Sequence, residues 1–154
     1  MEHEFYIERT LRLAKKAEGF TTPNPMVGAL LVKNNQIIAE DYHKKPGTPH
    51  AEALVLSRAG EKTKGSTLYV NLEPCCHTDK RTPPCTKSII SAGIKKVVIA
   101  MLDPNPKVAG KGVKELSDAG IDVVYGILEE KAKKLNTVKI ISEDEFLTLI
   151  QGSE

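Results

Sequence analysis

One histidine and two cysteines, separated by long stretches of chain, place the strongest constraint on the fold that this sequence can adopt. His50 is followed by Ala51 and Glu52, and both Cys75 and Cys85 come directly after a proline. One imidazole and two thiolates fill three of the four tetrahedral positions around a zinc ion and leave the fourth open for water. If these residues bind one ion, the fold must bring three separate segments to a single point.

The same residues, in this order, are typical of zinc-dependent deaminases. The signature of those enzymes is His-x-Glu followed by Pro-Cys-x-x-Cys, in which the glutamate serves as general acid and base. Here the first half matches, whereas nine residues, not two, lie between Cys75 and Cys85. We interpret the longer spacing as a substrate loop built into the metal site. Glu52 is then the group that moves protons to and from the water.

Three alternatives compete with a catalytic metal site. A disulfide is disfavoured because charged residues interrupt the first 13 positions, so we find no secretory signal and expect a reducing cytoplasm. A structural zinc site would close its shell with Cys76 or His77 as fourth ligand. Glu52 is alternatively a hydrogen-bond partner that orients His50. We favour catalysis because a structural site gains nothing from a fixed His-x-Glu.

Length, charge and hydropathy narrow the class of protein. The 154 residues suit one domain with its own core. No apolar stretch approaches the roughly 20 residues that cross a bilayer. The net charge is only +2, whereas a dedicated nucleic-acid binder usually has a strongly basic surface. We therefore expect a cytoplasmic globular domain that binds neither membranes nor nucleic acids.

Helical and strand patterns alternate along the chain. Helices are expected over residues 5–18, 50–59, 86–92, 113–119 and 129–135, and strands over 27–32, 36–42, 66–72, 95–101 and 121–125. Asn34-Asn35 is a turn signal, so the first two strands should form a hairpin. This alternation predicts a three-layer α/β/α domain with a central mixed sheet of about five strands, the later ones parallel. The ligands can then meet, since they lie at the ends of strands and the starts of helices.

Further motifs carry a resemblance to a known family. They are, in order, Thr22-Pro23-Asn24-Pro25-Met26-Val27-Gly28, His50-Ala51-Glu52, Leu72-Glu73-Pro74-Cys75-Cys76-His77, Thr82-Pro83-Pro84-Cys85 and Asp103-Pro104-Asn105-Pro106. Over roughly residues 5–135 the chain resembles the deaminase domain of the bifunctional riboflavin-biosynthesis deaminase–reductases, in the cytidine-deaminase-like superfamily. The resemblance implies one zinc ion per chain, bound by His50, Cys75 and Cys85, with Glu52 as proton shuttle.

The resemblance also implies a reaction. Enzymes of this family deaminate 2,5-diamino-6-ribosylamino-4(3H)-pyrimidinone 5′-phosphate hydrolytically, giving 5-amino-6-(5-phosphoribosylamino)uracil and ammonia in riboflavin biosynthesis. Two other functions stay open. One is a related deaminase acting on a free base, a nucleoside or a tRNA adenosine. The other is a non-catalytic zinc-binding module.

The loop between the cysteines is expected to contact the phosphate of the substrate. His77, Lys80 and Arg81 supply positive charge and hydrogen-bond donors close to the metal. The alternative is a solvated charged turn. The family usually has serine where Cys76 stands, and we expect Cys76 to pack as a small apolar residue.

Four more residues are assigned to the substrate by the resemblance. Asn24, between two prolines, is placed to present its amide to a pyrimidine edge. His43 matches a family histidine near the substrate, and Asp103 and Asn105 follow a strand end, where ligand-contacting loops are common. Without the resemblance, these residues would be read as a proline-rich turn, a structural histidine and a rigid turn.

The C-terminal end departs from the family pattern. We expect a deaminase domain over residues 1–141 and a helical tail over 142–154 in place of the reductase domain. Ser142 would be the N-cap of that helix and Glu145 its capping-box partner. Because no glycine-rich dinucleotide fingerprint occurs, no reductase activity is expected. The resemblance further implies a homodimer or homotetramer.

Overall fold

A hairpin forms one edge of the sheet, as the sequence predicts. Strands β1 (Gly28–Lys33) and β2 (Gln36–Tyr42) pair antiparallel across the turn at Asn34 and Asn35. Both asparagines have positive φ, 53° and 63°. A two-residue turn with positive φ at both positions matches the twist of the flanking strands, and asparagine tolerates this conformation better than most residues.

The computed structural model describes residues 2–21, 24–76 and 85–136, and its strands form one five-stranded sheet. The order is β2-β1-β3-β4-β5, with β3 at Thr67–Leu72, β4 at Lys96–Met101 and β5 at Asp122–Tyr125. β1 pairs antiparallel with both of its neighbours, whereas β3, β4 and β5 are parallel. The prediction of a mixed sheet with parallel late strands is confirmed.

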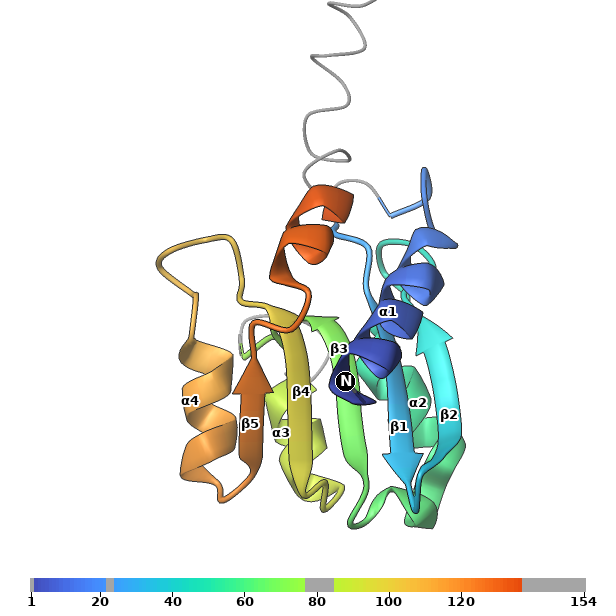
Figure 1. Ribbon diagram of the computed structural model, residues 1–154, viewed down its shortest axis with the longest axis vertical. Coiled ribbons are helices and arrows are strands. Elements are labelled where there is room, and N and C mark those ends of the chain that lie inside the picture. Colours follow the sequence, from blue (N-terminus) through green and yellow to red (C-terminus); the bar gives the residue numbers. More distant parts are fainter. Residues whose placement is uncertain (1, 22–23, 77–84, 137–154) are drawn as a thin grey trace, which may run out of the picture.

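Helices cover both faces of this sheet (Figure 1). The elements are α1 (Glu2–Lys15), α2 (Ala51–Ala59), η1 (Gly60–Thr63), α3 (Cys85–Ser91), α4 (Lys111–Asp118) and a further helical segment at 129–136. A hydrophobic cluster lies on each face of the sheet. One packs the sheet against α2, α3 and α4, and the other packs it against α1 and segment 129–136. Val97 and Ile99 of β4 belong to the first cluster and Val98 and Ala100 to the second, so the sheet is buried on both sides.

Helix α1 differs slightly from its predicted bounds. It begins at Glu2 and ends at Lys15, whereas the periodicity suggested residues 5–18. Residues 16 to 18 continue the chain as a turn, because their N–H groups donate to carbonyls three positions back and not four. The chain then reverses at Gly19, with φ of 86°. The helical pattern therefore extends one turn beyond the α-helix proper.

Close packing of α1 on the sheet depends on Gly28. A Cβ atom at this position would lie 2.2 Å from the carbonyl oxygen of Thr10 and 2.8 Å from the backbone nitrogen of Ala14. No side chain fits there unless the helix moves away. Gly28 therefore fixes the height of α1 above the first residue of β1.

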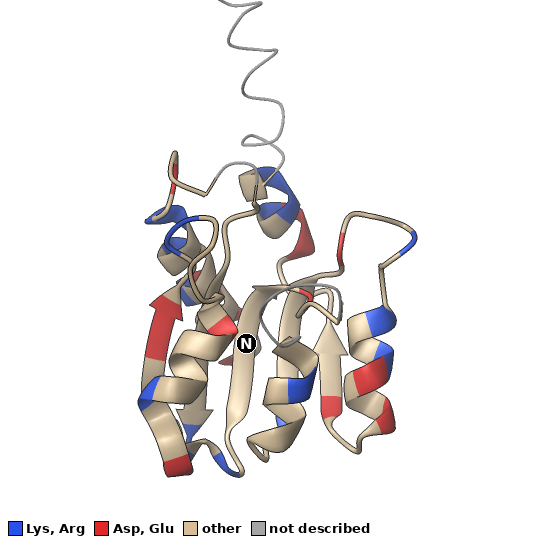
Figure 2. Cartoon of the chain, turned by 180° about the vertical axis from the view of Figure 1, so that it is seen from behind, with Lys and Arg blue, Asp and Glu red and all other residues tan. Residues whose placement is uncertain are grey.

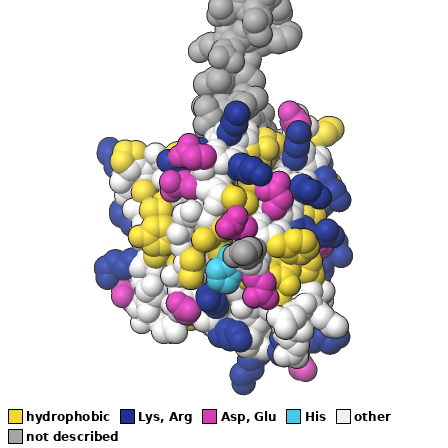
Figure 3. Space-filling view, in the orientation of Figure 1, with side chains coloured by type: hydrophobic (Ala, Val, Ile, Leu, Met, Phe, Trp, Pro, Cys, Tyr) yellow, Lys and Arg dark blue, Asp and Glu magenta, His cyan; other side chains and the backbone are white. Residues whose placement is uncertain are grey.

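Charged residues lie mainly on the helices and toward the sheet edges, as Figure 2 shows from the α2–α3 side. On the opposite face, positive and negative side chains are interspersed with hydrophobic ones (Figure 3). Within the part of the chain that the structure describes, no helix combines the length and apolar character needed to span a membrane. The tail predicted at 142–154 lies outside the described residues.

Candidate metal centre and active site

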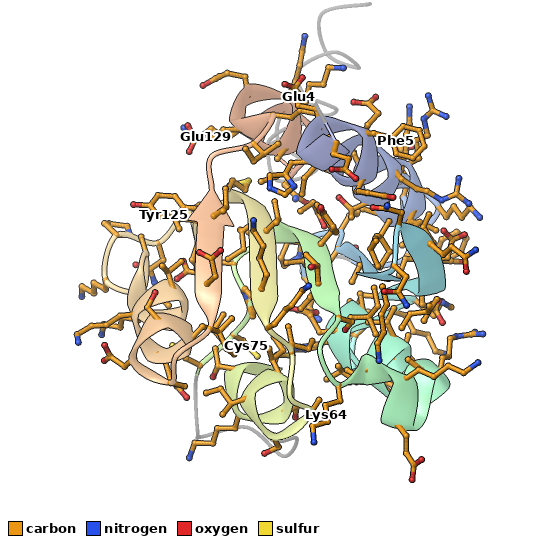
Figure 4. The ribbon with its side chains drawn as sticks, turned by 60° about the horizontal axis from the view of Figure 1, so that its bottom comes forward. Glu4, Phe5, Lys64, Cys75, Tyr125 and Glu129 are labelled. Atoms are coloured by element: carbon orange, nitrogen blue, oxygen red, sulfur yellow. The ribbon has the colours of Figure 1, made fainter. Side chains whose placement is uncertain are left out.

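The three predicted zinc ligands converge beyond the carboxyl end of β3, the central strand of the sheet. His50 is the N-cap of α2, Cys75 follows β3, and Cys85 is the first residue of α3. His50 Nδ1 lies 3.3 Å from Cys85 Sγ and 3.7 Å from Cys75 Sγ, and all three donor atoms fall within 4.8 Å of one another. Figure 4 shows Cys75 beside α3, across the sheet from Phe5 on α1.

The donor set fits zinc in geometry and in chemistry. In a tetrahedral site with Zn–N near 2.0 Å and Zn–S near 2.3 Å, nitrogen and sulfur lie about 3.5 Å apart. The observed separations of 3.3 and 3.7 Å bracket this value. Contact with the Cys85 thiol lowers the pKa of Cys75 to about 4 against the opposing effect of burial, with help from His50 and the Cys85 N–H. A lowered pKa favours the thiolate, which is the form of cysteine that binds zinc. All three cysteines are free of disulfides.

Glu52 is a buried carboxylate next to this cluster. It lies in the first turn of α2, with only 4% of its surface exposed. Burial raises its pKa to about 7, an effect opposed by its backbone hydrogen bond and by His50. A cation bound nearby would shift this pKa downward. Near neutral pH, such a carboxylate both accepts and releases protons readily.

A small cavity opens beside the cluster and reaches Glu52. Its volume is about 170 Å³. Cavities of roughly 150 Å³ accommodate a benzene ring, so one six-membered ring fits. The lining residues are Asn24, Pro25, Val27, His43, His50, Glu52, Leu72, Glu73, Cys75 and Asp103. The structure thus places Asn24, His43 and Asp103 beside the metal cluster, and their contact with the substrate stays a prediction.

His43 and Asn24 form a short hydrogen-bonded chain at the cavity wall. His43 Nδ1 lies 3.1 Å from the carbonyl oxygen of Pro49, which can only accept, so Nδ1 carries the proton. In the neutral ring Nε2 then accepts from Asn24 Nδ2, at 3.4 Å. This arrangement fixes the orientation of the Asn24 amide, and within the described residues its Oδ1 can accept a ligand N–H group.

Sequence reasoning did not find the role of the Glu73 side chain. Glu73 Oε1 accepts the N–H groups of Asp103, at 2.9 Å, and Gly110, at 3.0 Å, and Oε2 accepts that of Val113 at 3.0 Å. Gly110 is the N-cap of α4 and has no side chain of its own to cap the helix. The buried Glu73 carboxylate supplies that acceptor from the end of β3. It thereby fixes the loop that carries Asp103.

Helix α4 packs closely against the end of β3 at Glu73 and Pro74 because residue 112 is a glycine. A Cβ on Gly112 would lie 2.5 Å from the carbonyl oxygen of Pro74 and 3.1 Å from the Glu73 side chain. A glutamate before a Pro-Cys pair, together with a glycine in the first turn of a later helix, is a signal that could have suggested this contact. No sequence pattern indicates that the N–H groups of Asp103, Gly110 and Val113 bind this carboxylate.

The remaining predicted site residues do not line the cavity within the described part of the chain. His77, Lys80 and Arg81 lie outside the described residues. Asn105 does not line the cavity; its Oδ1 accepts the N–H of Lys107, which matches the alternative of a rigid turn. Cys76 is half-buried, and burial raises the pKa of its thiol.

Comparisons with known proteins agree with this site. Residues 1–101 match the cytidine and deoxycytidylate deaminase zinc-binding region. Riboflavin biosynthesis protein RibD of Aquifex aeolicus is 54% identical over 147 residues, which cover 94% of this chain and 41% of that protein. The diaminohydroxyphosphoribosylamino-pyrimidine deaminase of Buchnera aphidicola is 51% identical over 136 residues, which cover 88% of this chain and 92% of that protein.

Among solved structures, Acinetobacter baumannii RibD (form 1) superposes with a TM-score of 0.87 and 48% identity, covering 92% of this chain and 39% of that one. The chain thus spans about two fifths of these RibD relatives and nearly all of the Buchnera deaminase. The predicted fold and the resemblance are confirmed. The chain belongs to the cytidine and deoxycytidylate deaminase zinc-binding family, and its relatives there include the deaminase domains of RibD.

Proposed function

We propose that this chain deaminates 2,5-diamino-6-ribosylamino-4(3H)-pyrimidinone 5′-phosphate hydrolytically. The observation that carries the proposal is the buried Glu52 carboxylate, which borders a ring-sized cavity together with His50 and Cys75 of the metal cluster. The substrate class follows from the Buchnera relative, whose name specifies a diaminohydroxyphosphoribosylamino-pyrimidine. A ribosyl phosphate would extend from the open side of the cavity.

His50, Cys75 and Cys85 would hold the zinc ion. When bound, zinc supplies a Lewis acid that makes water a competent nucleophile at neutral pH. Glu52 takes one proton from the attacking water and passes it to the ring nitrogen, then takes the proton of the hydroxyl group now on the ring carbon and passes it to the departing amine. The bond from the ring carbon to the amine breaks, a carbonyl replaces it, and ammonia leaves. The Glu52 carboxylate is unchanged at the end of the cycle.

The cavity walls would orient the ring. Asn24 Oδ1, left as an acceptor by its contact with His43, is suited to an N–H group of the pyrimidine. Asp103 offers a second acceptor on the opposite loop. His77, Lys80 and Arg81 remain the predicted contacts of the phosphate. The homo-oligomer, the cytoplasmic location and the lack of reductase activity also stay predictions.

The test is ammonia release by the zinc-loaded protein with the diaminopyrimidine ribotide as substrate. Glu52→Gln keeps the size of the side chain and removes its basicity, so we expect activity to fall at least about 100-fold. Zinc content, measured by elemental analysis, should stay at one ion per chain. Glu8→Gln makes the same chemical change at an exposed ion pair with Lys131, and should leave the rate at the wild-type value.

Competing substrates separate the proposal from its alternatives. Cytidine, deoxycytidylate and a tRNA adenosine stem-loop should release little ammonia. Turnover of any of these without turnover of the ribotide would assign the chain to a different deaminase. Full zinc loading with no turnover of any aminopyrimidine would favour a non-catalytic zinc-binding module.

A further inference from the structure

Two buried asparagine side chains form hydrogen bonds with the backbone of Met26. Asn136 Oδ1 accepts the N–H of Met26 at 2.8 Å, and Asn136 Nδ2 donates to the Met26 carbonyl at 3.3 Å. Asn71 Nδ2 donates to the same carbonyl at 3.0 Å, while Asn71 Oδ1 accepts the N–H of Gly28 at 2.8 Å. We call these two side chains the amide clamp.

The amide clamp takes over where strand pairing stops. The ladder between β1 and β3 ends at Ala29 opposite Val70. Asn71 is the next residue of β3, and its side chain bonds Gly28 and Met26 in place of a backbone partner. Asn71 is fully buried, and Asn136 is 5% exposed. Because buried polar groups need partners, both amides have one orientation, in which each uses its oxygen and its nitrogen.

The clamped residue lies in the middle of a cavity wall. Asn24, Pro25 and Val27 line the cavity, whereas the Met26 side chain is buried in the protein. The Val27 carbonyl also accepts the N–H of His43, at 2.9 Å. Residues 24–27 carry no strand or helix of their own. The position of this wall relative to Glu52 therefore depends on side-chain hydrogen bonds to Met26.

We propose that Asn71 and Asn136 are positioning residues for substrate binding, and that Asn136 makes this cavity wall depend on helical segment 129–136. The inference rests on the proposed function, because it takes the ring of the substrate to occupy the cavity. Neither asparagine lines the cavity, so both act through residues 24–27. Their loss should weaken substrate binding more than it slows the chemical step at Glu52.

Asn136→Ala is the main test, since Asn136 lies at the end of the described chain and its loss leaves the sheet ladder intact. We expect KM for the ribotide to rise on the order of tenfold, the scale of one or two buried hydrogen bonds, with kcat within about threefold of wild type. Zinc content should not change. Where Asn136→Ala does not yield folded protein, Asn136→Ser, too short to bridge to Met26, makes the same test.

Amide hydrogen exchange followed by NMR reports on the amide clamp without catalysis. In Asn136→Ala, the Met26 N–H should exchange at least about tenfold faster, while that of Leu30, within β1, keeps its wild-type rate. Two matched controls should match wild type in KM and in Met26 exchange. Ile121→Val removes one methylene group from the core residue that directly precedes β5. Lys133→Ala removes a surface ion pair with Glu129 within segment 129–136.

The outcomes separate the two claims. An unchanged KM and unchanged Met26 exchange in Asn136→Ala would overturn the inference. A fall in kcat alone would also overturn it, because that result indicates a merely structural role. If the wild-type chain releases no ammonia from the ribotide, the proposed function fails, and Met26 exchange by itself decides whether Asn136 holds this wall.

Discussion

Replacing Glu73 by glutamine tests how strongly one buried carboxylate organises the loop that faces the metal cluster. The wild-type side chain accepts three backbone N–H groups, from Asp103, Gly110 and Val113, at 2.9 to 3.0 Å. Glutamine can still accept the first two through its carbonyl oxygen. Its NH₂ group then faces the N–H of Val113, where two donors meet.

The magnitude follows from these contacts. A hydrogen bond to a charged group contributes about 1.5–3 kcal/mol, and a buried donor left unpaired costs about 1–3 kcal/mol. Glu73→Gln loses one such bond and weakens the other two, so we expect a decrease of about 1.5–3 kcal/mol in the free energy of unfolding. Glu73→Ala loses all three bonds, and we expect about 3–5 kcal/mol. The negative charge at the start of α4 is lost in both variants.

Urea unfolding at one fixed excess of zinc measures these differences. Glu115→Gln is the matched control, because Glu115 lies on α4, the helix that Glu73 caps, and accepts a hydrogen bond from the Thr86 hydroxyl at 3.0 Å. Glutamine can keep that bond, so the control should lose no more than about 0.5 kcal/mol. A Glu73→Gln variant no less stable than Glu115→Gln, or a Glu73→Ala variant no less stable than Glu73→Gln, would show that the Glu73 carboxylate does not hold this loop.

Two further predictions concern the packing and the pH dependence of the fold. Gly28→Ala should lower the unfolding free energy by about 1–3 kcal/mol in urea titrations, because its Cβ would overlap the backbone of α1; wild-type stability would show that α1 moves freely. Burial tends to raise the pKa of Asp41, but hydrogen bonds from Lys44, the Tyr42 N–H and Arg58 hold it below its ordinary value of 3.8. Between the lowered folded pKa and 3.8 the unfolded chain binds more protons than the folded one, so stability rises with pH. The stability lost in Asp41→Asn should therefore be constant above about pH 5 and shrink as pH falls below 4; a gap that widens in acid would contradict this sign.

The elements of the fold are predictable because their signals lie within each segment. After Lys96, the rest of β4 is apolar and buried, as is typical of a strand covered on both faces. The turn residues Asn34 and Asn35 specify the hairpin by their tolerance of positive φ. The zinc ligands are predictable for a related reason, since few functions require one histidine and two cysteines at the ends of such elements.

The polar contacts that shape the cavity could not be predicted, because they join residues far apart in the chain. Asn136 is 110 positions from Met26, and Glu73 is 37 positions from Gly110. Asn71 is a visible irregularity in an apolar strand, and burial implies that it has a partner. That partner is set by the pairing of β1 with β3, which no local pattern specifies. Asn105 illustrates the converse, because a side chain predicted to contact the substrate bonds its own loop at Lys107.

These two kinds of contact divide the site into parts with different supports. The metal donors lie at the ends of α2, β3 and α3, which backbone hydrogen bonds and two hydrophobic clusters hold in place. The loops that face them are held by a few polar side chains: the two asparagines of the amide clamp for residues 24–27 and Glu73 for Asp103. Because the supports are separate, altering Asn136 or Glu73 should change substrate affinity while zinc content is retained. A fold built in this way can change its substrate through the loops without rebuilding the metal centre.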